Sequence, residues 1–431
     1  MENFYLVDYI RKNFNIDEDI LDSIKSALDK QIYYFGDHFI APRENTANIS
    51  LLLKKVFYDA VSECSFMYNA LSRHRPLTKE NNIISDSYYS VNDELRKIGY
   101  NVYKPFWCSV RCQDVSVDLN LYRESKAIND ILENGDFADH ISEKFIKKIK
   151  DFREHLKNFY IANNASALIV PNDASFFENL SIKIFKEIKK PSFIFLHGLP
   201  GRYNKIDENR SDYLIVWGDK IKENYINAGF PGSKILVSGH PSYKEFHYKE
   251  LKFDVENILI ITNVSFDTAQ DGEGAYLSDR GNSILYLYSI QNVLEKIGVR
   301  SVRLRVHPCE NRKWYYKFID KDFFKLDNED LDNSLKKSTL VIGPTSTVFL
   351  AAVYHGVNYL IYEPAVNDIG LMNIRLVPPF DGRDKRIPVA KDEGELTQLL
   401  VRKTKTDVSF FNDYIKTPFD ISFIKNYIKD K

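Results

Sequence analysis

The chain has 431 residues, a length that predicts two or three domains. Apolar residues make up 44% of the sequence and charged residues 28%, which is typical of a soluble globular protein and excludes a largely disordered chain. The 59 Lys and Arg residues nearly balance the 60 Asp and Glu residues, so the basic excess of a nucleic-acid-binding protein is absent. We therefore expect no nucleic-acid partner.

The cysteines and the N-terminal residues bear on metal binding and localisation. Cys108 and Cys112 lie four residues apart, but no second Cys/His pair follows, so the sequence predicts reduced thiols and no zinc site. The N-terminal MENFYLVDYIRKNF lacks the basic region and long apolar stretch of a signal peptide. No apolar run reaches the ~18 residues of a spanning helix. These features predict a cytoplasmic protein and leave open a peripheral contact with the membrane.

The first 160 residues or so are predicted to be mostly helical. Asp17–Lys30 and Ile49–Ser62 carry apolar residues at a spacing of three to four. Asn82–Asp86 and Asn101–Pro105 have the character of short strands that flank a helix. Lys144–Phe159 predicts a basic amphipathic helix whose charged face meets either water or a membrane surface, water being the favoured reading.

From residue 166 onward, short apolar runs alternate with helical segments, which predicts a parallel sheet covered on both faces. The first group of expected strands comprises Ser166–Val170, Ser192–Leu196, Tyr213–Trp217 and Lys234–Val237. The second group comprises Asn257–Thr262, Val302–Val306, Thr339–Ile342 and Tyr359–Tyr362. The expected helices between them are Phe176–Lys190, Lys220–Ala228, Ser283–Ile297, Arg312–Ile319 and Thr347–His355.

The repeat of this pattern predicts an α/β protein with two Rossmann-like domains facing a cleft, preceded by a helical N-terminal portion. We expect a first domain over residues 1–245 and a charged linker over residues 246–256. The second domain should span residues 257–405, and residues 406–431 should form helices that pack back across the domains.

Ligands of open α/β sheets bind at the carboxyl ends of the strands, so the residues that follow each strand matter most. His197 and Gly198 follow one first-domain strand, within His-Gly-Leu-Pro-Gly-Arg. An imidazole at a strand end, with glycines that allow close approach of a ligand, suits a general base. The alternative is a turn in which the histidine satisfies a backbone group. Asp173 and Arg202 are further candidates on this side, for contact with an acceptor.

His307 and Pro308 follow a second-domain strand, and proline suits the first turn of a helix, whose positive end favours an anion such as phosphate. Arg305 adds positive charge nearby. A plain strand-to-helix turn is the alternative. A second His-Pro pair, His240-Pro241, is more simply structural.

Gly343-Pro344-Thr345-Ser346-Thr347 follows another second-domain strand and opens an apolar helix. Hydroxyls and backbone N–H groups at such a position can hold a phosphate, although Ser and Thr are also the commonest N-cap residues. Glu363 follows the next strand, where a carboxylate can bind ribose hydroxyls.

The order of these motifs resembles the bacterial GT-B transferases that use cytidine-activated donors. These include the sialyl- and polysialyltransferases of capsule synthesis and the CDP-glycerol glycerophosphotransferases of teichoic acid synthesis. In those families a His-Pro pair and a later Ser/Thr pair hold the nucleotide and its phosphate, and His307-Pro308 and Thr345-Ser346-Thr347 match them. The resemblance covers residues 166–364.

One position separates the two families. The sialyltransferases have an acidic pair before the glycine, whereas the glycerophosphotransferases have His-Gly-x-Pro, which His197-Gly198-Leu199-Pro200 matches. Asp271 and Glu273 superficially resemble the acidic motif, but they lie in the second domain, on the donor side.

The resemblance implies a glycosyltransferase of bacterial surface polysaccharide synthesis, such as capsule or O-antigen, that uses a CMP- or CDP-linked donor. His197 would deprotonate the hydroxyl of a saccharide or lipid-linked acceptor. Fixed donors can neutralise the leaving phosphate in place of a metal, so we expect no metal or cofactor. The donor-binding residues would be His307, Pro308, Gly343, Thr345, Ser346, Thr347, Glu363 and Arg305.

Two other readings stay open. A nucleotide-sugar 2-epimerase of the same two-domain fold would use carboxylates in the cleft, such as Asp173 or Asp86. A non-catalytic binding protein could keep the fold without the reaction.

Overall fold

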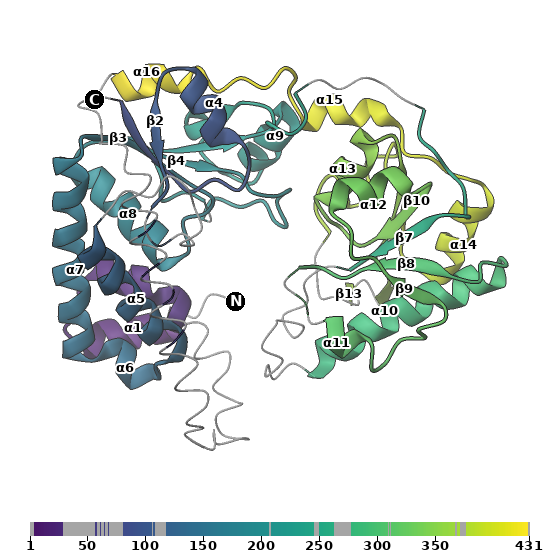
Figure 1. Ribbon diagram of the computed structural model, residues 1–431, viewed down its shortest axis with the longest axis horizontal. Coiled ribbons are helices and arrows are strands. Elements are labelled where there is room, and N and C mark those ends of the chain that lie inside the picture. Colours follow the sequence, from purple (N-terminus) through teal and green to yellow (C-terminus); the bar gives the residue numbers. More distant parts are fainter. Residues whose placement is uncertain are drawn as a thin grey trace.

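Two six-stranded parallel sheets, each covered by helices, form the two domains of the computed structural model (Figure 1). This confirms the predicted fold class, an α/β protein with two Rossmann-like domains in the manner of the GT-B class. The structure describes residues 4–28, 57, 61, 64, 68, 81–105, 107, 118–206, 208–244, 250–262, 277–308, 310, 312–366, 369–370 and 376–429.

The first sheet has the strand order β2-β1-β3-β4-β5-β6. Its strands are β1 (Asn82–Ser85), β2 (Asn101–Tyr103), β3 (Ala165–Val170), β4 (Ser192–Phe195), β5 (Tyr213–Val216) and β6 (Ile235–Val237). Every residue of β1 and β4 is buried, because helices cover both faces of the sheet. The chain leaves β1 toward β2 and returns to place β3 on the other side of β1. The switch in direction therefore lies between β1 and β3.

The described helices of the first domain are α1 (Phe4–Asn13), a helix over residues 18–28, α4 (Val91–Lys97), α5 (Leu119–Asn134), α6 (Phe137–Ile141), α7 (Glu143–Ala162), α8 (Phe176–Glu187), α9 (Asp219–Asn227) and the 3-10 turn η1 (Gly232–Lys234). The helices α4, α7, α8 and α9, and the helix over residues 18–28, lie close to predicted positions, whereas no bounds were predicted for α1, α5 and α6. The predicted helix Ile49–Ser62 lies almost wholly outside the described residues. Only its residues 57 and 61 are described, and both are helical.

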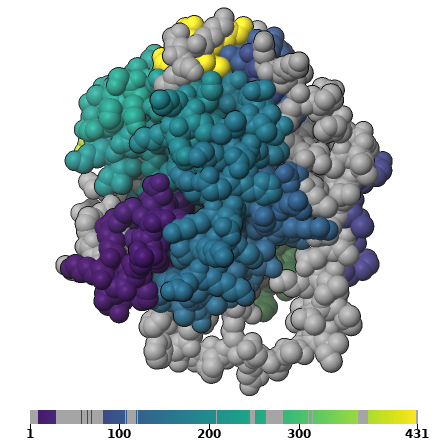
Figure 2. Space-filling view, turned by 90° about the vertical axis from the view of Figure 1, so that its left-hand side faces the viewer, coloured from purple at the N-terminus to yellow at the C-terminus, as the bar shows by residue number. Residues whose placement is uncertain are grey.

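The helix α7 shows why the sequence folds as it does here. Its apolar side chains, at a spacing of three to four, face the core, and the Ser142 hydroxyl caps it by accepting from the Phe145 N–H. On its outer face, Arg153 and Lys157 pair with Glu187 of α8. Such pairing fits a face turned to water. Figure 2 shows α7 in blue beside the purple N-terminal helices on this side of the domain.

The second sheet has the order β14-β11-β10-β7-β8-β9, and its switch point lies between β7 and β10. Its strands are β7 (Ile258–Ile261), β8 (Val302–Arg305), β9 (Phe324–Leu326), β10 (Leu340–Gly343), β11 (Asn358–Tyr362) and β14 (Val389–Ala390). The sequence did not predict the two edge strands β9 and β14, because three and two residues are too few to show an alternating pattern.

The helices of the second domain flank this sheet, and a short hairpin follows β11. They are α10 (Leu277–Lys296), α11 (Arg312–Tyr315), α12 (Leu331–Lys337), α13 (Val348–Tyr354) and α14 (Glu393–Val401), with the hairpin strands β12 (Ala365–Val366) and β13 (Ile369–Gly370). Within the described parts of the chain, no helix combines the length and the apolar character that crossing a membrane requires.

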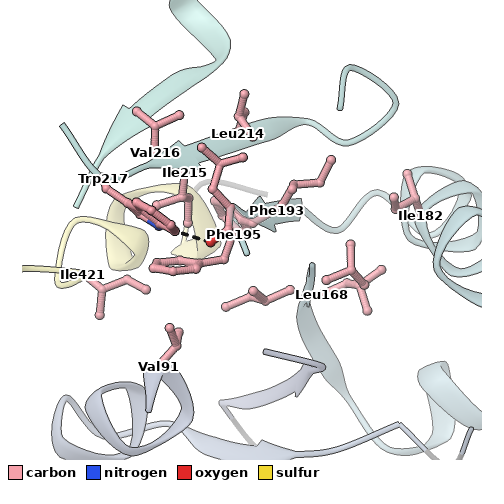
Figure 3. Packing of buried hydrophobic residues seen from close by; sticks show 14 of the residues in the cluster. Val91, Leu168, Ile182, Phe193, Phe195, Leu214, Ile215, Val216, Trp217 and Ile421 are labelled. Atoms are coloured by element: carbon pink, nitrogen blue, oxygen red, sulfur yellow. Dashed lines mark hydrogen bonds between the residues drawn. The ribbon is translucent and has the colours of Figure 1, made fainter. Parts of the chain in front are cut away.

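After α14 the chain returns to the first domain through η2 (Val408–Phe410), α15 (Phe411–Tyr414) and α16 (Ile424–Lys429) (Figure 1). The Lys416 N–H donates to the Trp217 carbonyl, and the Asp420 N–H donates to the Ser238 carbonyl, each at 2.8 Å. Ile421 packs into the core of the first domain (Figure 3). The last described residues therefore complete the first domain.

Candidate functional site

The motifs that follow β4 and β10 meet between the two domains. The Leu199 N–H of the first domain donates to Thr347 Oγ1 of the second at 3.1 Å. Gly198 lies so close that a Cβ built on it would be 3.3 Å from the same oxygen. Since each motif follows the carboxyl end of a central strand, this contact brings together the ends of the two sheets at which α/β proteins bind ligands.

His197 is fixed at both its backbone and its ring. Its Nδ1 lies 2.9 Å from the carbonyl oxygen of Pro171, which can only accept, so Nδ1 carries a proton, and in the neutral ring the lone pair is on Nε2. The His197 carbonyl accepts from the Tyr89 hydroxyl at 2.6 Å. The preceding carbonyl, of Leu196, accepts from Trp217 Nε1 at 3.1 Å (Figure 3). The residue is exposed, and this neutral tautomer is the form that a general base needs.

A buried carboxylate that the sequence analysis did not single out holds the His307-Pro308 turn. The His307 N–H lies 3.2 Å from Glu310 Oε2 and 3.0 Å from Thr262 Oγ1. Glu310 also accepts from the Thr262 hydroxyl and, at 2.8 Å, from the Tyr315 hydroxyl. Partial burial lowers the pKa of the His307 imidazole, so the ring is neutral near pH 7 and donates from a single nitrogen.

Arg305 has a structural task. Its guanidinium donates to the Glu329 carbonyl at 2.6 Å and to the Ser334 hydroxyl at 3.1 Å, at the start of α12. The neighbouring Arg303 pairs with the buried Asp327 at 3.0 Å. These contacts hold the Arg305 side chain against the start of α12, and its donor-binding role stays a prediction.

Thr347 is not an ordinary helix cap. Its side chain makes no capping hydrogen bond to α13, whereas the Val348 N–H donates to the Ser346 hydroxyl at 3.3 Å. The hydroxyl oxygen of Thr347 instead accepts from Leu199 of the other domain. Gly343 packs so tightly under this loop that a Cβ on it would lie 2.3 Å from Ile261. The loop is therefore held in a fixed position.

Glu363 holds the loop that contains Thr345, Ser346 and Thr347. It is buried, and its Oε1 accepts from the Thr345 N–H at 2.5 Å. Burial raises the pKa of this carboxyl group. The residue thus anchors the Thr345 backbone, and its ribose-binding role stays a prediction.

Asp173 is likewise used by the fold. It is buried and accepts from the backbone N–H groups of Glu208 and Arg210, at 3.2 and 2.9 Å, and it faces the Arg210 guanidinium at 3.6 Å. These contacts give Asp173 a structural role, and its acceptor-side role stays a prediction. Arg202 is exposed and lies on the segment that continues from His197.

His240 is structural, as its place at the domain crossing suggested. Its ring is buried within 4.2 Å of the Tyr89 ring and 4.6 Å of the Trp217 ring, measured between ring centroids. Its Nδ1 accepts from the Ser242 N–H at 3.1 Å. Burial lowers the pKa of the imidazole to about 3, so the residue stays neutral.

No group of three or more His, Cys, Asp or Glu side chains suited to a metal ion occurs in the described part of the chain. Asp271, Glu273, Cys108 and Cys112 lie outside that part, so the expectations attached to them stay predictions.

No protein-family model and no curated protein sequence matches this chain. Among solved structures, a UDP-GlcNAc 2-epimerase from Neisseria meningitidis bound to UDP-GlcNAc is similar, with 12% identity, 81% of this chain and 98% of the other covered, and a TM-score of 0.45. A variant of the wall teichoic acid polymerase TagF shows 13% identity, coverage of 88% and 95%, and a TM-score of 0.42. The S. aureus protein MnaA with UDP shows 12% identity, coverage of 86% and 94%, and a TM-score of 0.42.

Proposed function

We propose that the protein is a glycosyltransferase of bacterial surface polysaccharide synthesis. It transfers a sugar or alditol phosphate from a nucleotide-activated donor to an acceptor hydroxyl. The hydrogen bond between Leu199 and Thr347 is the observation that carries this proposal. It supports the proposal because it joins the loop that contains the candidate base His197 to the loop that contains the candidate phosphate site.

The donor phosphate binds on the second domain. Thr347 accepts a hydrogen bond from Leu199, so its own proton is left to donate toward a phosphate oxygen. The Ser346 hydroxyl and the neutral His307 ring are further donors. Hydrogen bonds to an ionised oxygen are about twice as strong as neutral ones, and donors fixed in advance stabilise the charge that develops on a leaving phosphate. We propose this set of donors in place of a metal ion.

The acceptor hydroxyl binds on the first domain, at His197. Nε2 takes the proton of this hydroxyl while its oxygen attacks the donor. The hydrogen bond from Nδ1 to Pro171 keeps the ring in the required tautomer and stabilises the imidazolium that forms. A base of this kind contributes about 10²- to 10⁴-fold in rate.

The nucleotide is proposed from the sequence resemblance, which indicates a cytidine donor. A thermal-shift screen with CMP, CDP, UDP and GDP tests it, because a ligand at ~100 times its dissociation constant adds about 2.7 kcal/mol of stability. Cytidine nucleotides should protect most. A clear preference for UDP would refute the cytidine assignment.

Incubation with the preferred nucleotide sugar then separates the reaction classes. Transfer to an acceptor supports the proposal. An isomerised donor without transfer would indicate a 2-epimerase, for which Asp86 is the remaining carboxylate candidate, since Asp173 is held by the fold. Binding without any conversion would indicate a non-catalytic protein.

A further inference from the structure

The segment that follows β1 lies at the switch point of the first sheet, the position where open α/β sheets most often bind ligands. It reads Asp86-Ser87-Tyr88-Tyr89. His197 lies near this segment. Its Nδ1 is hydrogen-bonded to the carbonyl oxygen of Pro171, the first residue after β3, and β3 pairs with β1. The proposed base therefore stands beside a segment that the proposed function does not yet use.

Tyr88 presents an aromatic ring next to the base. Its side chain is 72% exposed, and its ring centroid is 5.7 Å from that of His197, with the planes inclined by 50°. The residues on either side hold it there: Ser87 is buried, and Tyr89 donates to the His197 carbonyl. The ring is thus an exposed, flat apolar surface beside the His197 imidazole. The face of an aromatic ring carries partial negative charge, which attracts the C–H groups on the apolar face of a sugar.

Asp86 and Ser87 directly precede Tyr88 in the chain, and Glu178 lies close to Asp86, so polar side chains suited to hydroxyls occur in the same segment and beside it. Asp86 is half-buried, and it lies close enough to Glu178 of α8 to raise the pKa of that carboxyl group, although burial is the larger cause. Glu178 is only 8% exposed. The buried Ser87 hydroxyl has no hydrogen-bond partner among the described residues. A carboxylate such as that of Asp86 accepts hydrogen bonds from sugar hydroxyls and repels an anionic acceptor, and a carboxyl group that keeps its proton, as burial favours at Glu178, can also donate one.

We propose that Asp86, Ser87, Tyr88 and Glu178 form the acceptor subsite and that the acceptor is a neutral saccharide, whose ring stacks on Tyr88 with one hydroxyl directed at His197. This inference rests on the proposed function and excludes a polyol-phosphate chain as the acceptor. In the reaction, the acceptor O–H bond breaks and its proton passes to His197 Nε2. The acceptor oxygen forms a bond to the sugar carbon of the donor, and the bond from that carbon to the phosphate oxygen breaks, so the nucleotide leaves with the electron pair.

Binding measurements test the subsite without requiring turnover. Saturation-transfer NMR with the methyl glycosides of glucose, galactose and N-acetylglucosamine, in the presence of CMP, should show contact with the wild-type protein. Tyr88→Ala should weaken this binding about 5- to 10-fold, Tyr88→Phe should preserve it, and Asp86→Asn should weaken it. Tyr288→Ala, which removes a ring that is 60% exposed on α10, is the matched control and should have no effect. CMP affinity should be equal in all four variants.

The outcomes separate this inference from the proposed function. If the glycosides bind through Tyr88 but no sugar is transferred, the subsite stands and the transferase proposal fails. If sugar is transferred and Tyr88→Ala leaves the acceptor KM unchanged, the subsite is wrong. Preferential binding of sn-glycerol 3-phosphate over all three glycosides would also overturn it, as would the absence of glycoside binding.

Discussion

His240 should make the stability of the protein depend on pH in a direction that a single substitution can reveal. The change is His240→Asn. The side-chain oxygen of Asn can accept from the Ser242 N–H in place of Nδ1, but it cannot be protonated in the pH range of interest. The variant therefore removes the titration while keeping the polar contact among the surrounding rings.

The expected change in the free energy of unfolding follows from the difference in the pKa of His240 between the folded and unfolded chain. Burial lowers the pKa of His240 from 6.5 to about 3. As the pH falls below 6.5, the unfolded chain binds a proton that the folded protein refuses, so stability is lost on acidification and the loss continues toward pH 3. Between pH 7 and pH 5 this loss is about 2 kcal/mol.

Glu178 acts in the opposite sense. Its pKa is raised from 4.5 to about 7, chiefly by burial, so the folded protein keeps a proton that the unfolded chain releases. Its contribution to stability is present at low pH and declines by about 2 kcal/mol as the pH rises from 5 to 7. The two effects nearly cancel in the wild-type protein, so the comparison between variants is the informative measurement.

Urea unfolding of the wild type, His240→Asn and Glu178→Gln at pH 7 and pH 5 provides that comparison. Relative to wild type, His240→Asn should gain about 2 kcal/mol on acidification and Glu178→Gln should lose about 2 kcal/mol. If the free energy of unfolding of His240→Asn follows the wild type across this range, the buried neutral state of His240 is refuted.

Three further substitutions test the proposed site. Thr347→Val should weaken nucleotide binding about 10-fold or more, since a hydrogen bond to an ionised group contributes ~1.5–3 kcal/mol; unchanged affinity by calorimetry would remove Thr347 from the phosphate site. His197→Ala should lower kcat by about 10²- to 10⁴-fold and leave nucleotide affinity intact, whereas near-wild-type kcat would exclude it as the base. Glu310→Ala should destabilise the protein by about 2–4 kcal/mol, because it removes the buried acceptor that the Tyr315 and Thr262 hydroxyls share, and Glu310→Gln should cost less; equal melting temperatures for both variants and wild type would contradict this account.

The sequence predicted the central strands well because they are buried on both faces. The apolar runs of β4 and β7 have no polar face, and that pattern is typical of a covered parallel sheet. The edge strand β9 was missed because it has three residues and exposes its middle one, Lys325. The return of the C-terminal residues was expected, but their partners in the first domain were not specified, because those contacts join distant parts of the chain.

For the candidate site, the sequence located residues at strand ends but could not assign their contacts. His197 and Thr347 were singled out separately, and only the fold shows that their loops meet. Glu363 was singled out for its place at a strand end, whereas burial gives it a structural contact to Thr345. Glu310 carried one usable signal, a carboxylate three residues after His307. Tyr88 carried none, because an exposed aromatic residue becomes informative only when its neighbour is known.

The returning C-terminal segment affects the order in which the protein can fold during its synthesis. A Cβ on Gly218 would lie 2.3 Å from the Tyr414 backbone, and one on Gly239, whose φ is +84°, would lie 2.3 Å from the Lys416 carbonyl oxygen. The first domain thus presents grooves that only residues far along the chain fill. Although N-terminal domains generally fold first on the ribosome, this one gains its last contacts only after the second domain and residues 411–429 have emerged. Until then the Phe195 ring lacks its contact with Phe419, and the Trp217 and Ser238 carbonyls lack the backbone donors Lys416 and Asp420.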